Sequence, residues 1–325
     1  MGGARSILVT GGAGFIGSHV CDALVAAGHV VRCMDNLATG KRANIAHLEP
    51  DPRFSFLEAD IRDPGACEGA VTGVDAVVHL AALGSVPRSI HDPASSEATN
   101  LAAFLNLLEA CVAAGVQRMV YASSSSVYGD SAASPKREGQ EGEPLSPYAV
   151  TKVMDEAYAA LYHRKHGLRI IGLRFFNVFG ERQDPNGPYA AAIPRFITSL
   201  LAHRAPQVHG DGRQTRDFTY VGNAVGSVVA ALAANDPRAF GNVFNVAFGQ
   251  STDLLTLIDR LRAHLAKHDP AVANVGVEHV ADRSGDVRAS LADIARSRGI
   301  LGWQPDYDLE AGLQRAVPWY LVHWR

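Results

Sequence analysis

The stretch Ile7-Leu8-Val9-Thr10-Gly11-Gly12-Ala13-Gly14-Phe15-Ile16-Gly17 joins an apolar run to a glycine-rich turn and to the start of an amphipathic segment. The apolar run is typical of a buried strand, and the segment Ile16–Ala27 has the pattern of a helix. Glycines between a strand and a helix let backbone amide groups approach a pyrophosphate at the helix N-terminus. The stretch therefore predicts a dinucleotide-binding strand–turn–helix unit.

An acidic residue follows the next apolar run, where such a unit requires one. Asp35 ends the segment His29–Met34, and a carboxylate there accepts a hydrogen bond from a ribose 2′-hydroxyl and repels a 2′-phosphate. The residue favours NAD over NADP, although Arg32, Lys41 and Arg42 nearby weaken that preference. A plain glycine-rich turn is the alternative, but it would not require strand, glycines, helix and acid in this order.

The first half of the chain alternates short apolar runs with amphipathic stretches, which is typical of a parallel sheet covered on both faces. We predict a Rossmann-type, doubly wound α/β fold in residues 1–177, which would bind NAD. The rhythm changes after Asn177, and residues 178–325 are predicted to form a smaller α/β region that binds mainly the nucleotide sugar, with some segments crossing back. The expected strands are Ile7–Thr10, His29–Met34, Phe54–Leu57, Ala76–Leu80, Met119–Ala122, Ile170–Phe175 and Val243–Val246, and the expected helices are Ile16–Ala27, Asn100–Ala114, Pro147–His166, Ile193–Ala202, Ala224–Ala233 and Leu254–Leu265.

Composition restricts the other classes of function. The 325 residues are 47% hydrophobic with a net charge of −3, and no basic stripe suits a nucleic acid. We see neither a signal-peptide pattern nor an apolar stretch that would span a membrane. Four cysteines stand far apart, as in a protein with reduced thiols, so we expect a cytoplasmic protein. No His-Glu-x-x-His spacing occurs, and no metal site is expected.

A tyrosine and a lysine share one face of the expected helix that starts at Pro147. Tyr148 and Lys152 stand at positions i and i+4. Free tyrosine has a pKa of about 10, and a neighbouring ammonium group favours the phenolate that base catalysis needs. Four serines, Ser123 to Ser126, follow an apolar strand, where a hydroxyl can relay a proton from a sugar to the tyrosine. Together these residues predict proton transfer beside the dinucleotide.

With these motifs the sequence resembles the extended short-chain dehydrogenase/reductase family, and within it the nucleotide-sugar 4-epimerases. It is particularly similar to the bacterial group that acts on UDP-N-acetylhexosamines for surface polysaccharides. The resemblance runs nearly from end to end. The segments that carry it are residues 81–89, 144–152, 173–180, 182–187 and 285–288.

The resemblance implies a cofactor and a mechanism. NAD stays tightly bound and is not consumed, because hydride leaves carbon 4 of the sugar and later returns to its opposite face. Ser124, Tyr148 and Lys152 are the implied catalytic residues. The implied cofactor-binding residues are Gly11, Gly14, Phe15, Ile16, Gly17, Asp35, Asn36, Asp60, Ile61, Ala81, Asn100, Ser123, Tyr148 and Lys152.

The resemblance also implies a UDP-sugar site. Arg216 and Arg283 match arginines that clamp the diphosphate, and a guanidinium fork suits phosphate oxygens. Without the resemblance, each arginine would be interpreted as a solvated surface charge. The implied substrate-binding residues are Ser85, Arg88, Ser124, Ser125, Ser126, Asn177, Gln183, Arg216, Arg283, Asp286 and Ser290.

Ser290 bears on the choice of sugar. It matches a position where a bulky tyrosine excludes an N-acetyl group from strict UDP-glucose enzymes, so a serine favours UDP-GlcNAc and UDP-GalNAc, with UDP-glucose and UDP-galactose also allowed. Ser290 would also suit a helix N-cap. A 4-epimerase of a UDP-uronate remains open, because Arg88 would suit a carboxylate.

Other activities within the resemblance are less favoured. Sugar-nucleotide 4,6-dehydratases carry an Asp-Glu pair where this chain has Ser125 and Ser126, whose hydroxyls are poor acids and bases near neutral pH. A non-catalytic NAD-binding regulator is an alternative of a different class, but it would not need the tyrosine, lysine and serine together. The resemblance also implies a homodimer.

Overall fold

Seven parallel strands form the central sheet of the protein. The structure is a computed structural model that describes residues 4–185, 191–281 and 288–324. The strands lie in the order β11-β6-β5-β4-β1-β2-β3. The predicted doubly wound Rossmann-type fold is therefore confirmed. Their bounds are β1 Ser6–Thr10, β2 Val30–Asp35, β3 Phe54–Glu58, β4 Ala76–His79, β5 Arg118–Ser124, β6 Arg169–Phe175 and β11 Asn242–Val246.

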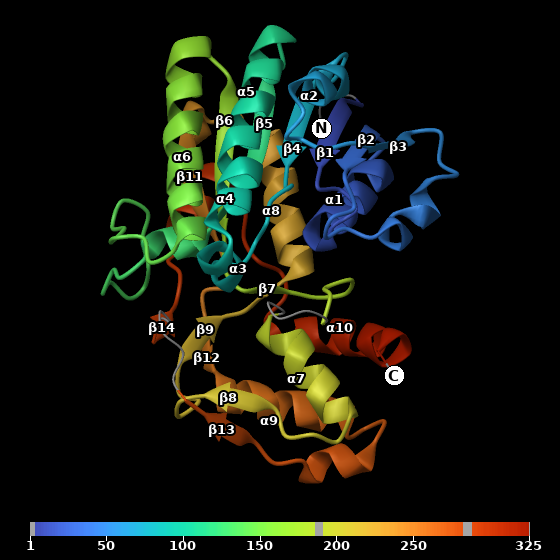
Figure 1. Ribbon diagram of the computed structural model, residues 1–325, viewed down its shortest axis with the longest axis vertical. Helices are drawn as coiled ribbons and strands as arrows, with labels where there is room; N and C mark the ends of the chain where they lie inside the picture. Colours follow the sequence, from blue (N-terminus) through green and yellow to red (C-terminus); the bar gives the residue numbers. More distant parts are fainter. Residues whose placement is uncertain (1–3, 186–190, 282–287, 325) are drawn as a thin grey trace.

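Helices cover both faces of this sheet (Figure 1). Successive side chains of a strand point to opposite faces, so Ile7 and Val9 of β1 pack in one core and Leu8 packs in the other. The first core includes residues of helices α1 and α8, and the second includes residues of α2, α5 and α6. These helices are α1 Phe15–Ala26, α2 Pro64–Val71, α5 Ala103–Ala113, α6 Pro147–His166 and α8 Val221–Ala233.

A second, smaller region lies beyond the carboxyl ends of the strands (Figure 1). Its helices α7, α9 and α10 surround a separate core that includes Ile197, Leu261 and Tyr320. Three small sheets complete it, with the strand orders β12-β9-β14, β13-β8 and β10-β7. The elements are α7 Ala192–Leu201, α9 Leu254–Leu265, α10 Leu309–His323, β7 Val178–Phe179, β8 Gln207–His209, β9 Thr215–Asp217, β10 Thr219–Tyr220, β12 Ser251–Asp253, β13 Glu278–Val280 and β14 Ala289–Ser290.

Two elements of the second half return to the central sheet. Strand β11 pairs in parallel with β6, from Asn242 opposite Ile171 to Val246 opposite Phe175. Helix α8 packs in the same core as α1, through side chains such as Val228 and Ala231. The sheet that holds the site is thus completed by residues beyond 178, whereas the assignment of residues 178–325 to nucleotide-sugar binding stays a prediction.

The sequence-based element boundaries were correct for the long periodic segments and missed several short ones. Helix α6 begins and ends where it was expected. The expected helix Asn100–Ala114 is instead a π-helical turn, Ala98–Ala102, followed by α5. The α-helices missed are α2, α3 Val86–His91, α4 Pro93–Glu97 and α10, and the short strands β7, β9, β10, β12, β13 and β14 were missed as well. The first three of these are too short to show a helical period.

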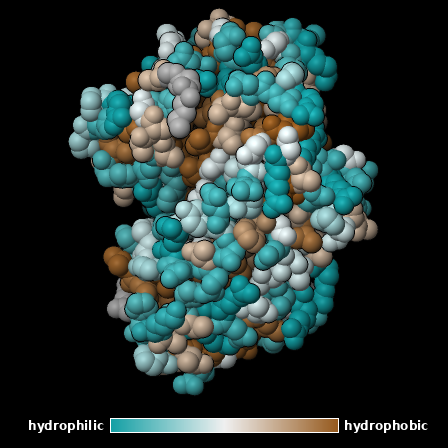
Figure 2. All heavy atoms as spheres, turned by 180° about the vertical axis from the view of Figure 1, so that it is seen from behind, coloured by the Kyte–Doolittle hydropathy of each residue, from teal (hydrophilic) through white to brown (hydrophobic). Residues whose placement is uncertain are grey.

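Figure 2 shows hydrophilic and hydrophobic residues intermixed on one face, with a notch in the outline between the upper and lower parts of the molecule. None of the helices in the described ranges has the length and apolar character needed to cross a membrane.

Candidate active site

A cavity of about 810 Å³ opens at the carboxyl ends of the central strands. Strands β1 and β4 are neighbours there, and the chain leaves them toward opposite sides of the sheet, which is where open α/β sheets bind ligands. The predicted site residues in its wall are Gly11, Gly14, Phe15, Ile16, Gly17, Asp35, Asn36, Ile61, Ala81, Ser85, Ser123, Ser124, Ser125, Ser126, Tyr148, Lys152, Asn177, Gln183, Arg216 and Ser290.

The turn between β1 and α1 requires glycine at positions where a side chain would overlap with neighbouring backbone atoms. Gly11 has a φ of 69°, and its N–H donates to Met34 O at 2.8 Å. A Cβ atom on Gly17 would lie 2.1 Å from the carbonyl oxygen of Gly11. Gly14 is the N-cap of α1 and offers no side chain to its amide groups. The first-turn amides of this helix are therefore available to a pyrophosphate.

Asp35 lines the cavity and also holds the glycine turn. Its Oδ2 accepts a hydrogen bond from Ala13 N at 3.0 Å, and its Oδ1 accepts one from Leu37 N at 2.8 Å. Burial raises the pKa of Asp35, against the opposing effect of these amide donors. Each carboxylate oxygen has a second lone pair, so the residue can still accept from a ribose hydroxyl.

Asp60 lies behind the cavity wall rather than in it. Asn36 donates from Nδ2 to Asp60 Oδ2 at 2.9 Å, and Arg62 donates to the same carboxylate from Nε and Nη2. These Arg62 hydrogen bonds hold the pKa of Asp60 well below its usual range. The wall itself contains Asn36, Ile61 and Arg62, so Asp60 orients the residues that face the cavity.

Asn100 is fully buried and also acts from behind the wall. Its Oδ1 accepts a hydrogen bond from Leu83 N at 2.7 Å, and its Nδ2 donates to Leu83 O at 3.3 Å. The segment that it fixes includes Ala81, and a Cβ atom on Gly11 would lie 2.6 Å from Ala81 N. Asn100 thus secures the strand end against which the glycine turn packs.

The three predicted catalytic residues line the same cavity. Ser124 ends β5, and its Oγ accepts a hydrogen bond from Ser126 N at 3.1 Å. Tyr148 lies in the first turn of α6, where its N–H donates to Ser89 Oγ at 3.0 Å. Lys152 follows one turn later, and all three line the same wall. The arrangement can move a proton between a bound hydroxyl and the tyrosine.

Lys152 is held by two oxygens in a buried position. Its Nζ donates to Ala122 O at 3.0 Å and to Asp155 Oδ2 at 3.0 Å. Burial alone would lower the pKa of Lys152, but the charges of Asp155 and Tyr148 outweigh burial and raise it. Asp155 is three residues after Lys152 on the predicted helix, and this spacing brings two side chains together. The sequence therefore contains a signal for this pair.

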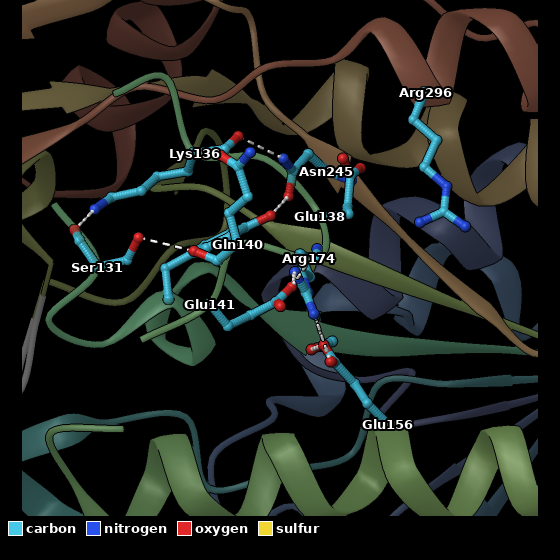
Figure 3. Close-up of polar contacts among 12 residues, drawn as sticks. Ser131, Lys136, Glu138, Gln140, Glu141, Glu156, Arg174, Asn245 and Arg296 are labelled. Atoms are coloured by element: carbon cyan, nitrogen blue, oxygen red, sulfur yellow. Dashed lines mark hydrogen bonds and ion pairs between the residues drawn. The ribbon is translucent and has the colours of Figure 1, made fainter. Parts of the chain in front are cut away.

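Charged residues link the end of β5, which carries Ser123 and Ser124, to α6 (Figure 3). Arg174 of β6 lies between Glu141 and Glu156, and its Nη2 is 2.7 Å from Glu156 Oε2. Ser123 Oγ donates to the Oε1 atom of Glu156 at 2.5 Å. The end of β5, which carries Ser124, is thereby fixed relative to the helix that carries Tyr148.

The far end of the cavity contains the residues expected at the UDP-sugar. Asn177 has a φ of 36° and donates from Nδ2 to Asp217 O at 3.2 Å. The Gln183 side chain donates to Val178 O at 3.0 Å, while its Oε1 is buried and has no hydrogen-bond partner among the described residues. Ser126 Oγ is likewise buried without one. Such atoms are polar groups that a ligand can satisfy.

Ser290 is not a helix N-cap, so that expectation was wrong. It ends the two-residue strand β14, which pairs in parallel with β9 and places Ser290 opposite Arg216. The backbone of Ser290 is therefore part of a sheet and does not begin a helix. The side chain remains at the cavity wall, together with that of Arg216.

Four further predicted residues remain, and they differ in where the structure places them. The Ser85 hydroxyl accepts from Arg88 N at 3.2 Å and caps helix α3, so Ser85 lines the cavity while Arg88 is not in its wall. Arg283 and Asp286 lie outside the described residues.

Two residues that the sequence interpretation missed also shape the far end. Lys136 is buried and lines the cavity, and its backbone pairs with that of Leu291 and Ala292. Asp217 is buried and accepts hydrogen bonds from the amides of Phe248, Gly249 and Ala292. Burial raises the pKa of Asp217 to about 7 against these donors. No local pattern marks either residue, because their contacts join distant segments.

The fold and this cavity define a dinucleotide-binding enzyme with a tyrosine–lysine pair in the cavity wall. The chain belongs to the NAD-dependent epimerase/dehydratase family, whose model matches residues 7–247. NAD is thus the cofactor, as predicted, and the predicted resemblance is confirmed.

Individual relatives match nearly the whole chain. The UDP-glucose 4-epimerase of Mycolicibacterium smegmatis is 37% identical over 320 residues, which are 96% of this chain and 97% of the relative. The dTDP-glucose 4,6-dehydratase of an Actinoplanes strain is 35% identical over 322 residues, 97% of each chain. The structure of UDP-N-acetylglucosamine 4-epimerase from Methanobrevibacter ruminantium, in complex with UDP-N-acetylmuramic acid, superposes with a TM-score of 0.90 at 36% identity and covers 98% of this chain and 99% of that one.

Proposed function

We propose that this protein is an NAD-dependent 4-epimerase of UDP-sugars that interconverts UDP-GlcNAc and UDP-GalNAc, with UDP-glucose and UDP-galactose as further substrates. The observation that carries the proposal is the position of Tyr148. It lines one cavity together with the glycine turn at one end and with Arg216 and Ser290 at the other. A cofactor and a nucleotide sugar bound at the two ends would both reach this tyrosine.

The residues divide the chemistry among themselves. NAD, when bound, accepts hydride from carbon 4 and returns it, so no net oxidation occurs and the cofactor stays bound. Tyr148 takes the proton of the 4-hydroxyl, with Ser124 bridging the two oxygens. The ammonium of Lys152 favours the phenolate by its charge. The 4-keto sugar turns over, and the proton then goes back from Tyr148 to the new hydroxyl.

The preference for an N-acetyl group rests on the size of Ser290 and on two buried polar atoms of other residues that line the cavity. A serine at the cavity wall leaves space that a tyrosine would fill. Gln183 Oε1 and Ser126 Oγ are buried without a hydrogen-bond partner among the described residues, and both residues line the same cavity as Ser290. They supply hydrogen bonds for an acetamido group. Arg216, and Arg283 from the sequence resemblance, would hold the diphosphate.

Dehydration of the same sugar is less favoured, despite the similarity to a dehydratase. Elimination across carbons 5 and 6 requires an acid and a base beside the tyrosine. The residues available there are Ser125 and Ser126, which begin a short 3₁₀ turn and line the cavity. Their hydroxyls exchange protons poorly near neutral pH.

A UDP-uronate is the second candidate substrate, because a buried lysine lines the sugar end. The Nζ of Lys136 donates to the carbonyl oxygen of Ser131. Its backbone pairs with that of Ala292, which is two residues after Ser290 in the sequence. A carboxylate on the sugar would gain an ion pair with such an ammonium group. Arg88, which the sequence suggested for this role, is not in the wall.

We also propose a cytoplasmic homodimer. The four cysteines are free and buried, which suits a reducing compartment. Val150, Val153 and Met154 on α6 are 45%, 36% and 38% exposed. An apolar patch of this kind on a long helix is suited to pairing with a second copy.

The test is epimer formation by the purified protein without added NAD. UDP-GlcNAc, UDP-glucose and UDP-glucuronate would be incubated separately and their products resolved by chromatography, with Tyr148→Phe as the matched control. Faster formation of UDP-GalNAc than of UDP-galactose supports the proposal. Turnover of the uronate alone would replace the substrate assignment but keep the mechanism. No turnover of any sugar, with NAD bound, would point to the non-catalytic regulator.

A further inference from the structure

Asp155 is a buried acid that no step of the proposed chemistry uses. It lies on α6 three residues after Lys152, its side chain is 0% exposed, and its Oδ2 is 3.0 Å from Lys152 Nζ. The other carboxylate oxygen, Oδ1, is buried and has no hydrogen-bond partner. Within the described part of the chain, the carboxylate therefore makes one hydrogen bond, and its partner is Lys152.

The position of Lys152 explains why a carboxylate beneath it matters. The side chain is only 2% exposed, and a buried ammonium group readily loses its proton unless an opposite charge compensates for the lost hydration. Bound NAD would add the positive nicotinamide ring to the same cavity, which disfavours the ammonium further. Lys152 helps Tyr148 only while it is charged, because a neutral amine does not stabilise a phenolate.

We propose that Asp155 is a positioning residue that keeps Lys152 protonated and in place in the NAD-bound enzyme, so that Lys152 can stabilise the Tyr148 phenolate. This role rests on the proposed function, but it concerns a charge state that can be measured without turnover. Asp155 does not touch the cavity, because only Lys152 and Tyr148 of this group lie in its wall.

The charged and titratable groups around the pair are consistent with this role. On α6 itself these are Tyr148, Lys152 and Glu156, and Glu156 is engaged by Arg174. Burial and the charge of Asp155 raise the pKa of Tyr121 of β5, and burial and the charge of Lys152 lower the pKa of His79 of β4. Burial raises the pKa of Asp155 to about 6, against the opposing effect of Lys152. Asp155 is the acid in direct contact with Lys152.

The test is the near-ultraviolet titration of tyrosinate at Tyr148 in the NAD-bound protein, with the same variant carrying Tyr148→Phe subtracted. In Asp155→Asn, we expect the midpoint of tyrosinate formation at Tyr148 to rise by about one pH unit and turnover at neutral pH to fall about tenfold. An unchanged or lower midpoint would overturn the proposal. A lysine that stays charged without Asp155 predicts a lower midpoint, because a negative charge has been removed.

Two further variants separate this role from a structural one. Glu156→Gln removes a neighbouring charge that contacts Arg174 instead of Lys152, and its midpoint should not rise. In a Lys152→Met background, Asp155→Asn should not raise the midpoint, because the residue through which Asp155 acts is gone and only a negative charge is removed. A rise in that background would contradict the proposal, and the comparison remains available if Asp155→Asn alone does not fold. If the unmodified protein forms no epimer although the tyrosinate midpoints are as expected, the result counts against the proposed function and not against the role of Asp155.

Discussion

Ser290 and Arg216 are paired residues in the parallel ladder between β14 and β9. The backbone of the residue expected to set the choice of sugar is therefore paired with the backbone of the residue expected to hold the diphosphate. Both line one cavity wall. The proposed sites for the sugar and for its diphosphate would thus share one small sheet, and a change at either residue can be tested for its effect on the other.

Ser290→Tyr should exclude the N-acetyl sugar. A phenol at this wall position would occupy the space that we assign to the acetamido group, so turnover of UDP-GlcNAc should fall at least about tenfold, while that of UDP-glucose stays within about threefold. Parallel kcat/KM measurements on the two sugars check this. Ser290→Ala is the control, which should keep both activities. Equal losses for both sugars in the tyrosine variant would mean that Ser290 does not select the substrate.

Tyr148→Phe should remove the proton-transfer group and leave binding intact. General acid–base groups contribute about 10²- to 10⁴-fold in rate, so we expect a loss of about 10³-fold in kcat, with UDP-GlcNAc affinity by calorimetry nearly unchanged. Tyr158→Phe on the same helix should retain activity, since Tyr158 belongs to the hydrophobic core beside α6. A Tyr148→Phe enzyme with more than a tenth of the normal kcat would rule out the assigned role.

Gly17→Ala should prevent NAD binding. The added methyl carbon would lie 2.1 Å from Gly11 O, and the shift needed to relieve this overlap moves the glycine turn. We expect purified protein to lose most of its bound NAD, and the free energy of unfolding to fall by about 1–3 kcal/mol. Absorbance of released cofactor and urea unfolding measure the two effects. Gly69→Ala is the control, because a Cβ atom there has no neighbour within 4 Å; similar NAD loss in that variant would contradict our explanation.

Asp217 should make stability depend on pH between about 4 and 7. Its pKa is raised by burial from 3.8 to about 7, so the folded protein holds this proton more tightly than the unfolded chain. The stabilisation is present below about pH 4 and is lost as the pH rises through about 7, on the order of 4 kcal/mol in total. Asp217→Asn should flatten this part of the profile.

Urea unfolding at several pH values measures this dependence. Asp155, whose pKa is also raised, contributes to the profile of both proteins and cancels in the comparison. The control is Asp259→Asn, because the Asp259 side chain is 69% exposed in its ion pair with Arg262. If Asp217→Asn and the normal protein show the same slope, Asp217 does not titrate in this range.

Local patterns explain which parts of the fold and site could be predicted. The strand, glycine turn and helix from Ile7 to Ala26 are adjacent in sequence, and so are Tyr148 and Lys152 on α6, so spacing alone indicated their relation. Helix α3 has six residues and offers less than two full turns of pattern. Asp217 contacts a residue more than 70 positions away in the sequence, and Lys136 contacts one more than 150 positions away. Contacts of that separation become visible only in three dimensions.

The return of β11 to the central sheet has a consequence for biosynthesis. Strand β6 is almost entirely buried and pairs with β11 along its outer side. Until residue 246 has left the ribosome, the backbone N–H and C=O groups on that side of β6 have no partner strand. Such an edge can pair with another nascent chain. Fragments that stop near residue 177 should therefore aggregate, and circularly permuted or split versions of the protein should keep residues 169–246 together.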